Sequence, residues 1–152
     1  MRALSSDEIL AAFAPDERKR VLQPEAPAWE HLDFLGWTHR SGHLGYLLWS
    51  DIGGASALVL DRSVIRTSGT RLFMCDLCCT VHEQGGVASF THRQRGRSRS
   101  HMLCADLQCS LYVRGRRETH CLQMPETLAV ADKVDRLRAK LDRLVVAFST
   151  CA

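Results

Sequence analysis

Two short stretches decide the fold of this chain: residues 75–78 read Cys-Asp-Leu-Cys, and residues 104–109 read Cys-Ala-Asp-Leu-Gln-Cys. Structural Zn²⁺ takes four tetrahedral ligands, and thiolates are among its preferred donors. Two intervening residues let a tight turn point both thiolates of the first pair at one ion. In the second pair, the first cysteine would end a strand and the second would lie in the first turn of a helix, whose positive end favours a thiolate. The pattern predicts a zinc site with four ligands: Cys75, Cys78, Cys104 and Cys109.

Other uses of paired cysteines fit this pattern less well. A thioredoxin-like redox centre has one C-x-x-C pair in a βαβ unit, whereas this chain has a second pair and β-rich flanks. A zinc deaminase needs His-x-Glu upstream of Pro-Cys-x-x-Cys. Here His82 and Glu83 are adjacent and lie downstream, and the proline is missing. Because four cysteines leave no open position on the metal, we expect structural zinc and no enzymatic activity.

Further cysteines and histidines lie near this pattern without an assigned role. Because side chains of neighbouring residues diverge, Cys79 should not share a metal ion with Cys78. We expect Cys79 to be a small buried residue rather than a ligand. His82 and His101 are near enough in sequence to compete with the cysteines as zinc ligands. A position on the surface, or beside a ligand, is the simpler interpretation for both histidines. The residues left unassigned are Cys79, His82, His101, Cys121 and Cys151.

The composition indicates one globular domain. The chain has 152 residues, of which 45% are hydrophobic and 24% charged. These figures exclude collagen, a mucin stalk, a disordered activator and a membrane bundle. The N-terminus has no apolar signal region, and the longest nearly apolar run, residues 55–60, is far too short to span a bilayer. Seven cysteines without an export signal indicate a reducing compartment, so we expect a cytoplasmic protein.

Positive charge is concentrated in one part of the sequence. The chain has 20 Lys and Arg against 17 Asp and Glu, a net charge of +3. Seven arginines fall between residues 91 and 117, where Asp106 is the only acid. Within this part, residues 91–100 alternate Arg with Gln, Gly and Ser, which is typical of a solvated loop. We therefore expect a basic loop at 91–100 that is either merely solvated or faces an anionic partner.

The hydrophobic pattern predicts an α+β domain: an antiparallel β-meander, the treble-clef arrangement of the zinc site, and a long C-terminal helix. Five aromatic residues between positions 29 and 49 are expected to fill the core. The expected elements are a helix over 5–14, strands over 34–40, 44–50, 55–60, 64–66, 70–74, 86–90 and 101–104, a turn at 61–62, and helical turns over 107–113.

The last helix is expected from about residue 126 to residue 148, with Pro125 at its first position. Its apolar residues are spaced 4, 3, 4, 3 and 4 apart: Val130, Val134, Leu137, Leu141, Leu144 and Phe148. This stripe either packs back onto the meander, which we favour, or forms a seam between two copies of the chain.

Several stretches together resemble a known family. They are the first cysteine pair with Thr80-Val81-His82, the turn and strand at 85–88, the run from Leu103 to Gly115, and the upstream segments 35–37 and 45–47. Over roughly residues 29–120 the chain is similar to the C-terminal treble-clef domain of the elongation factor G-binding proteins, which include the FusB-type fusidic acid resistance proteins.

The resemblance implies a zinc domain that grips elongation factor G and helps it leave the ribosome. Family members carry a helical bundle before this domain, whereas only about 28 residues precede the meander here. We therefore expect the single-domain form, with an N-terminal helical segment and linker over 1–28 and one globular zinc domain over 29–152.

Rigid residues beside the zinc ligands, together with the arginines, are the expected contacts with a partner, because Tyr and Arg are enriched among energetically important interface residues. An RNA- or ribosome-binding module that uses the loop 91–100 is the alternative function. The expected contact residues are Leu77, Arg93, Arg95, Arg97, Arg99, Met102, Tyr112, Arg114, Arg116 and Arg117.

Overall fold

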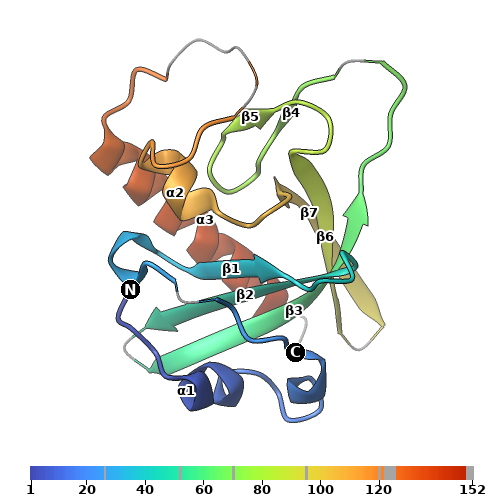
Figure 1. Cartoon of the computed structure of the whole chain (residues 1–152), viewed down its shortest axis with the longest axis vertical. Helices are drawn as coiled ribbons and strands as arrows, with labels where there is room; N and C mark the ends of the chain where they lie inside the picture. Colours follow the sequence, from blue (N-terminus) through green and yellow to red (C-terminus); the bar gives the residue numbers. More distant parts are fainter. Residues whose placement is uncertain are drawn as a thin grey trace.

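A five-stranded antiparallel sheet with strand order β1-β2-β3-β6-β7 forms the centre of the molecule (Figure 1). The computed structural model describes residues 1–25, 27–51, 53–69, 71–94, 96–119, 121 and 126–149. The sheet contains β1 (Leu35–Thr38), β2 (Leu44–Asp51), β3 (Gly54–Val64), β6 (Val87–Gln94) and β7 (Arg97–Cys104). The other elements are the hairpin β4 (Phe73–Met74) and β5 (Val81–His82), the helices α1 (Ser6–Ala11), α2 (Cys109–Val113) and α3 (Val130–Ser149), and the 3₁₀ turns Arg18–Arg20 and Trp29–His31. The expected α+β class, with an antiparallel sheet and a C-terminal helix, is confirmed.

The two faces of the sheet bury separate hydrophobic clusters, because successive side chains of a strand point to opposite faces. On one face, α1 packs against the aromatic residues of β1 and β2. The ring of Phe13 meets Trp37 and Tyr46 edge-on, each at a centroid distance of 6.0 Å. On the other face, Leu47, Leu60 and Phe90 pack with the cysteine segments and α3. The five expected core aromatics are therefore divided between the two faces. Trp37 and Tyr46 are buried on the α1 face, with Trp29 packed beside them, whereas Phe34 and Trp49 pack with the cysteine segments.

The apolar stripe of α3 is buried against this second face. Five of its six apolar residues are at most 8% exposed: Val134, Leu137, Leu141, Leu144 and Phe148. Val130, the first of the stripe, is 51% exposed. The stripe thus packs onto the sheet, which is the favoured one of its two expected uses.

Helix α1 begins at a capping box. The Ser5 hydroxyl accepts a hydrogen bond from the Glu8 backbone N–H, and the Glu8 carboxylate accepts one from the Ser5 N–H. These contacts satisfy N–H groups that the first turn leaves without helical partners.

Several expected boundaries are wrong. The strand expected over 64–66 is not formed, because β3 ends at Val64, and the described part of the strand expected over 70–74 is only Phe73–Met74. The helix expected over 5–14 ends at Ala11. The turn predicted at Asp61-Arg62 is the middle of β3, because the first part of that strand pairs with β2 and its last four residues pair with β6. The basic segment 91–100 is not a loop, because Thr91 pairs with Ser100 and Arg93 with Ser98 in the β6–β7 hairpin. The last helix begins at Val130 rather than near residue 126. Pro125 lies outside the described residues.

A buried carboxylate, that of Asp33, connects the segment before β1 with the end of α2 and with α3. The side chain of Asp33 is 1% exposed and accepts hydrogen bonds from Arg114, which follows α2, and from Arg138 of α3. Burial alone raises the pKa of Asp33, but these two guanidinium groups outweigh it and hold that pKa below its ordinary value.

None of the described helices is long and apolar enough to cross a membrane.

We predict that Asp33→Asn lowers the free energy of unfolding by about 3 kcal/mol, because it leaves the half-buried Arg114 without its counter-charge. Arg138→Gln, at a 59% exposed side chain, should cost less than about 1 kcal/mol. Urea unfolding measures both. Because the pKa of Asp33 is lowered in the folded state, its contribution should be complete at neutral pH and disappear as the pH falls through that lowered pKa. Equal losses in the two variants would contradict this assignment.

Candidate metal centre

The first cysteine pair lies on a tight turn between β4 and β5. The Cys79 N–H donates to the Cys75 carbonyl at 3.0 Å, and the Cys75 N–H donates to the Thr80 carbonyl at 3.0 Å. Cys79 has a φ of 61°, in the left-handed region that non-glycine residues seldom adopt. This turn directs the side chains of Cys75 and Cys78 toward the same point.

The second pair lies where β7 ends and α2 begins. Cys104 is the last residue of β7 and Cys109 the first of α2, as the sequence predicts. Between them, the Leu107 N–H donates to the Cys104 carbonyl at 2.9 Å, and Leu107 has a φ of 59°. Its side chain is 1% exposed in the core. This left-handed residue reverses the chain, so the four-residue spacer still returns Cys109 to Cys104.

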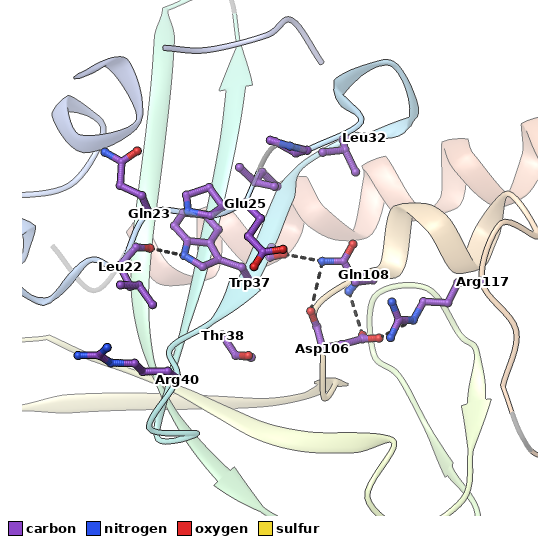
Figure 2. Close-up of a pocket in the computed structure, with 14 residues that line it drawn as sticks. Leu22, Gln23, Glu25, Leu32, Trp37, Thr38, Arg40, Asp106, Gln108 and Arg117 are labelled. Atoms are coloured by element: carbon purple, nitrogen blue, oxygen red, sulfur yellow. Dashed lines mark hydrogen bonds and ion pairs between the residues drawn. The ribbon is translucent and has the colours of Figure 1, made fainter. Parts of the chain in front are cut away.

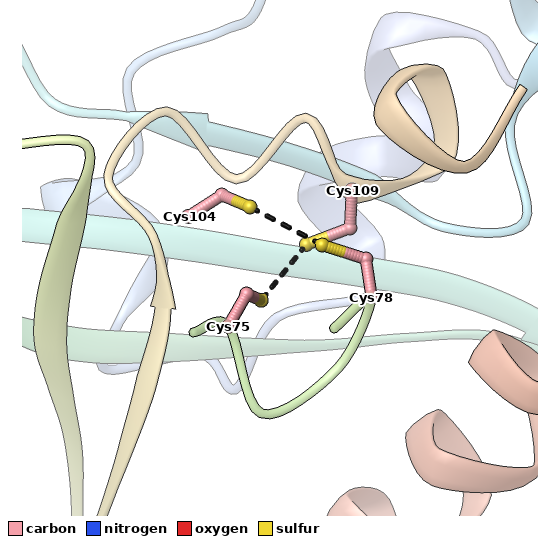
Figure 3. A group of neighbouring side chains, drawn as sticks. All are labelled: Cys75, Cys78, Cys104 and Cys109. Carbon is pink, nitrogen blue, oxygen red and sulfur yellow. Dashed lines mark hydrogen bonds between the residues drawn. The ribbon is translucent and has the colours of Figure 1, made fainter. Parts of the chain in front are cut away.

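The four sulfur atoms converge in one buried cluster (Figure 3). Each Sγ lies within 4.8 Å of every other. The Cys75–Cys109 pair is 3.7 Å apart and the Cys78–Cys104 pair 3.4 Å. All four residues are at most 2% exposed.

The pKa shifts of the four thiols indicate that the cluster favours a bound cation. Hydrogen bonds with Cys104 and then Cys109 lower the pKa of the Cys78 thiol, whereas hydrogen bonds with Cys104 and then Cys75 raise the pKa of Cys109. Neighbouring thiols therefore share protons, since four adjacent thiolates would repel one another. A divalent cation removes this conflict by holding all four as thiolates. Four buried sulfur donors at these separations fit a structural zinc ion.

His82, one of the unassigned histidines, supports the cluster. Its Nε2 lies 3.2 Å from the Cys104 Sγ, and its ring meets that of Tyr112 edge-on at 5.0 Å. The residue is 4% exposed, and burial lowers its pKa. A Cβ at Gly86 would lie 2.6 Å from the Cβ of His82, so the glycine makes room for this ring. Hydrogen bonds of this kind orient metal ligands and tune their basicity.

Cys79, Cys121 and His101 lie outside the cluster. The Cys79 Sγ is 2.9 Å from the Lys140 ammonium. Cys121 is buried but belongs to no metal-ligating group among the described residues. Cys151 lies outside those residues. His101 Nδ1 is 3.6 Å from the Asp76 carboxylate, and its ring contacts that of Phe148.

A cleft of about 540 Å³ separates residues 22–25 from the second cysteine segment (Figure 2). Within it, the Trp37 indole N–H donates to the Leu22 carbonyl at 2.7 Å. The Gln108 side-chain amide donates to the Gly36 carbonyl at 2.8 Å. These contacts join the N-terminal segment and the outer edge of β1 to the cysteine segment.

Comparison with known proteins identifies the family. A family model described as the FBP C-terminal treble-clef zinc-finger matches residues 9–147. The chain belongs to this family. Together with the four buried cysteines, this confirms the treble-clef resemblance and makes Zn²⁺ the cofactor of the domain.

A solved structure shares the fold. The fusidic acid resistance protein FusC aligns with a TM-score of 0.51 and 14% sequence identity, over 72% of this chain and 52% of that one. The chain thus spans about half the length of that structure. A search of curated proteins finds no match.

The structure separates the proposed partner-contact residues into two groups. Three of them are used inside the molecule: Leu77 is 1% exposed, Arg114 is paired with Asp33, and Tyr112 contacts Asp106. Arg117 is paired with Asp106 but its side chain is 50% exposed. Arg93 is paired with Asp61 but remains exposed. Exposed side chains without a described ion pair are Arg97, Arg99, Met102 and Arg116, and Arg95 lies outside the described residues.

We predict about one Zn²⁺ per chain in metal analysis of the purified, reduced protein. Replacing any one of the four clustered cysteines by Ser should remove most of the metal and destabilise the fold, because folding and metal binding are linked. Cys79→Ser and Cys121→Ser are the matched controls and should retain zinc. A folded, reduced protein without metal would contradict the assignment.

We also predict that Gly36→Ala destabilises the fold by about 2 kcal/mol, because overpacking strains a close contact. Its Cβ would lie 2.5 Å from the Leu107 carbonyl oxygen and 2.6 Å from the Leu107 Cβ. Since Leu107 lies between two cysteines, the variant should also release zinc to a chelator more readily. Ser56→Thr, which adds a methyl group at an exposed strand position, is the control and should leave both quantities unchanged.

Proposed function

We propose that this chain is a non-enzymatic zinc protein that binds elongation factor G in the cytoplasm and promotes its release from the ribosome. The observation that carries the proposal is the family match over residues 9–147, which includes four clustered cysteines. We infer elongation factor G as the partner because the motifs resemble those of the elongation factor G-binding proteins. The fold shared with the fusidic acid resistance protein FusC is consistent with that relationship.

The zinc centre suits a binding role because it rigidifies the surface around it. The ligands come from the β4–β5 turn, the end of β7 and the start of α2, so one ion would fix three segments. Side chains on rigid segments lose little conformational entropy when a partner binds. Met102, which is 39% exposed two residues before Cys104, is the apolar contact that we propose on this surface.

The exposed arginines suit an acidic partner. Arg97 and Arg99 lie on β7, and Arg116 follows α2. Cations on one side of a protein steer an oppositely charged partner and raise the association rate more than the final affinity. We expect this effect from Arg97 and Arg99 first, since Asp61 already neutralises Arg93.

Binding of RNA or the ribosome is the second candidate, favoured by the same arginines of the β6–β7 hairpin. Salt dependence separates the two functions. Affinity for single-stranded RNA falls with a slope of about −0.7 in log–log form for each phosphate contacted. Binding of a protein through a mixed apolar and polar surface should fall less steeply.

We predict that changing Arg93, Arg95, Arg97 and Arg99 to Gln slows association with purified elongation factor G about tenfold at low salt, because steering is lost. Zinc content and fold should be unchanged. Stopped-flow fluorescence over a range of salt concentrations measures the rate and its salt dependence. The control changes the charge equally elsewhere: Lys19, Arg20, Arg40 and Arg66 to Gln.

Two outcomes would count against the proposal. No binding of the zinc-loaded chain to elongation factor G would refute the function itself. Unaltered association of the hairpin variant would refute only the steering role of the arginines.

A further inference from the structure

The outer edge of β7 combines open backbone groups with unpaired positive charge. β7 is the last strand of the sheet, so only one of its edges is paired, with β6 (Figure 1). Backbone groups of successive residues point to alternate edges of a strand. The Met102 N–H and carbonyl both point outward, since they bond the Asp76 carboxylate at 2.8 Å and the Asp76 N–H at 2.7 Å. By the same alternation, the N–H and carbonyl groups of Ser98 and Ser100 also point outward.

The outward groups of Ser98 and Ser100 have no backbone partner among the described residues. Asp76 closes the edge at Met102, and no other described segment forms a ladder with β7 beyond it. Exposed strand edges of this kind accept an additional strand, unless side chains prevent it. Ser98 and Ser100 are small, exposed side chains that leave the edge accessible.

The charge beside this edge is positive. Arg97, Arg99 and His101 share the face of β7 that turns toward α3, because Leu103 of the same alternate set is buried with α3. Neither Arg97 nor Arg99 has an ion-pair partner in the part of the chain that the structure describes. An added strand would therefore place every second side chain next to these two guanidinium groups.

A small pocket lies where an added strand would stop. It measures about 350 Å³ and is lined by Asp76, Leu77, His101 and the α3 residues Lys140, Arg143, Leu144 and Ala147. Arg143 adds a further cation at its rim, exposed and without a described acidic partner. The Leu77 and Leu144 side chains give the pocket an apolar floor. This pocket suits one apolar side chain at the end of an acidic strand.

We propose that the edge of β7 from Arg97 to Ser100 is a docking site at which an extended acidic segment of a partner protein adds as a sixth strand. Acidic side chains of the segment face Arg97 and Arg99, and an apolar residue enters the pocket beside His101. The proposal deepens the proposed function by naming the kind of segment that the partner presents. It requires a protein partner, but not that this partner is elongation factor G.

The test uses the full, zinc-loaded chain and a fluorescent Glu-Val peptide, Leu-Val-Glu-Val-Glu-Val-Glu-Val-Leu, in which Glu alternates with Val and a Leu at each end lies on the Glu side to fill the pocket. We expect saturable binding by anisotropy, and none at the same concentrations by a peptide that alternates Lys with Val. At saturation, hydrogen exchange of the Ser98 and Ser100 amides should slow at least tenfold, while the Arg97 and Arg99 amides, already bonded to β6, should change little. A failure of either result overturns the proposal, even where elongation factor G still binds.

A matched pair of variants tests the backbone contact. Ser100→Pro removes an outward N–H, which an edge strand tolerates, and Ser100→Ala is its control. Both variants lose the hydroxyl contact with Thr91, which is 2.7 Å long in the native chain. We expect Ser100→Pro to bind the Glu-Val peptide about tenfold more weakly than Ser100→Ala, the loss of roughly one hydrogen bond. Equal affinities would overturn the proposal.

A second pair of variants tests the contribution of the arginine charges. N-methylated peptides test the backbone contact without changing the protein. Arg97→Gln with Arg99→Gln should weaken binding, whereas Arg93→Gln, at a residue on the opposite face, should not. If Ser100→Pro loses zinc, the native chain is tested with peptides N-methylated on one or the other alternate set of amides. Only one set should abolish binding. Equal effects of the two sets, or tighter binding of an eight-nucleotide RNA than of the Glu-Val peptide, would overturn the proposal.

Discussion

The convergence of four buried thiols is the constraint on which the rest of the structure depends. Their ligand atoms come from one turn, one strand end and one helix start, and each turn needs a residue in the left-handed region, Cys79 or Leu107. Neither turn would be maintained by its own apolar content alone, because α2 and the β4–β5 hairpin are too short to fold independently. The free energy of zinc binding is therefore part of the folding free energy of the whole domain.

The sequence predicts most of this centre because its signals are local. Ligand identity follows from residue type and spacing, and the stripe of α3 follows from the 3.6-residue period. The meander is predicted where apolar runs alternate with turns, as in β1 and β2. The basic hairpin is missed because Arg, Gln, Gly and Ser suggest solvated chain, whereas pairing across β6 and β7 overrides that local preference.

Contacts between distant residues could not be predicted from one sequence. Asp33 meets Arg114 and Arg138, which lie 81 and 105 positions later in the chain. The role of His82 depends on Gly86 being small enough to admit its ring next to Cys104. Each of these contacts forms only when the sheet, α2 and α3 are assembled. Residue spacing and composition therefore do not predict them.

Two residues next to zinc ligands each cap one position on an outer edge of the sheet: Asp76 bonds the backbone of β7 at Met102, and Gln108 bonds that of β1 at Gly36. Their positions depend on the metal-bound turns. Loss of zinc would release both caps at once and expose strand edges at opposite sides of one molecule. Such a chain could pair edge to edge in both directions. Through these two contacts the metal centre also protects the sheet against edge-to-edge association.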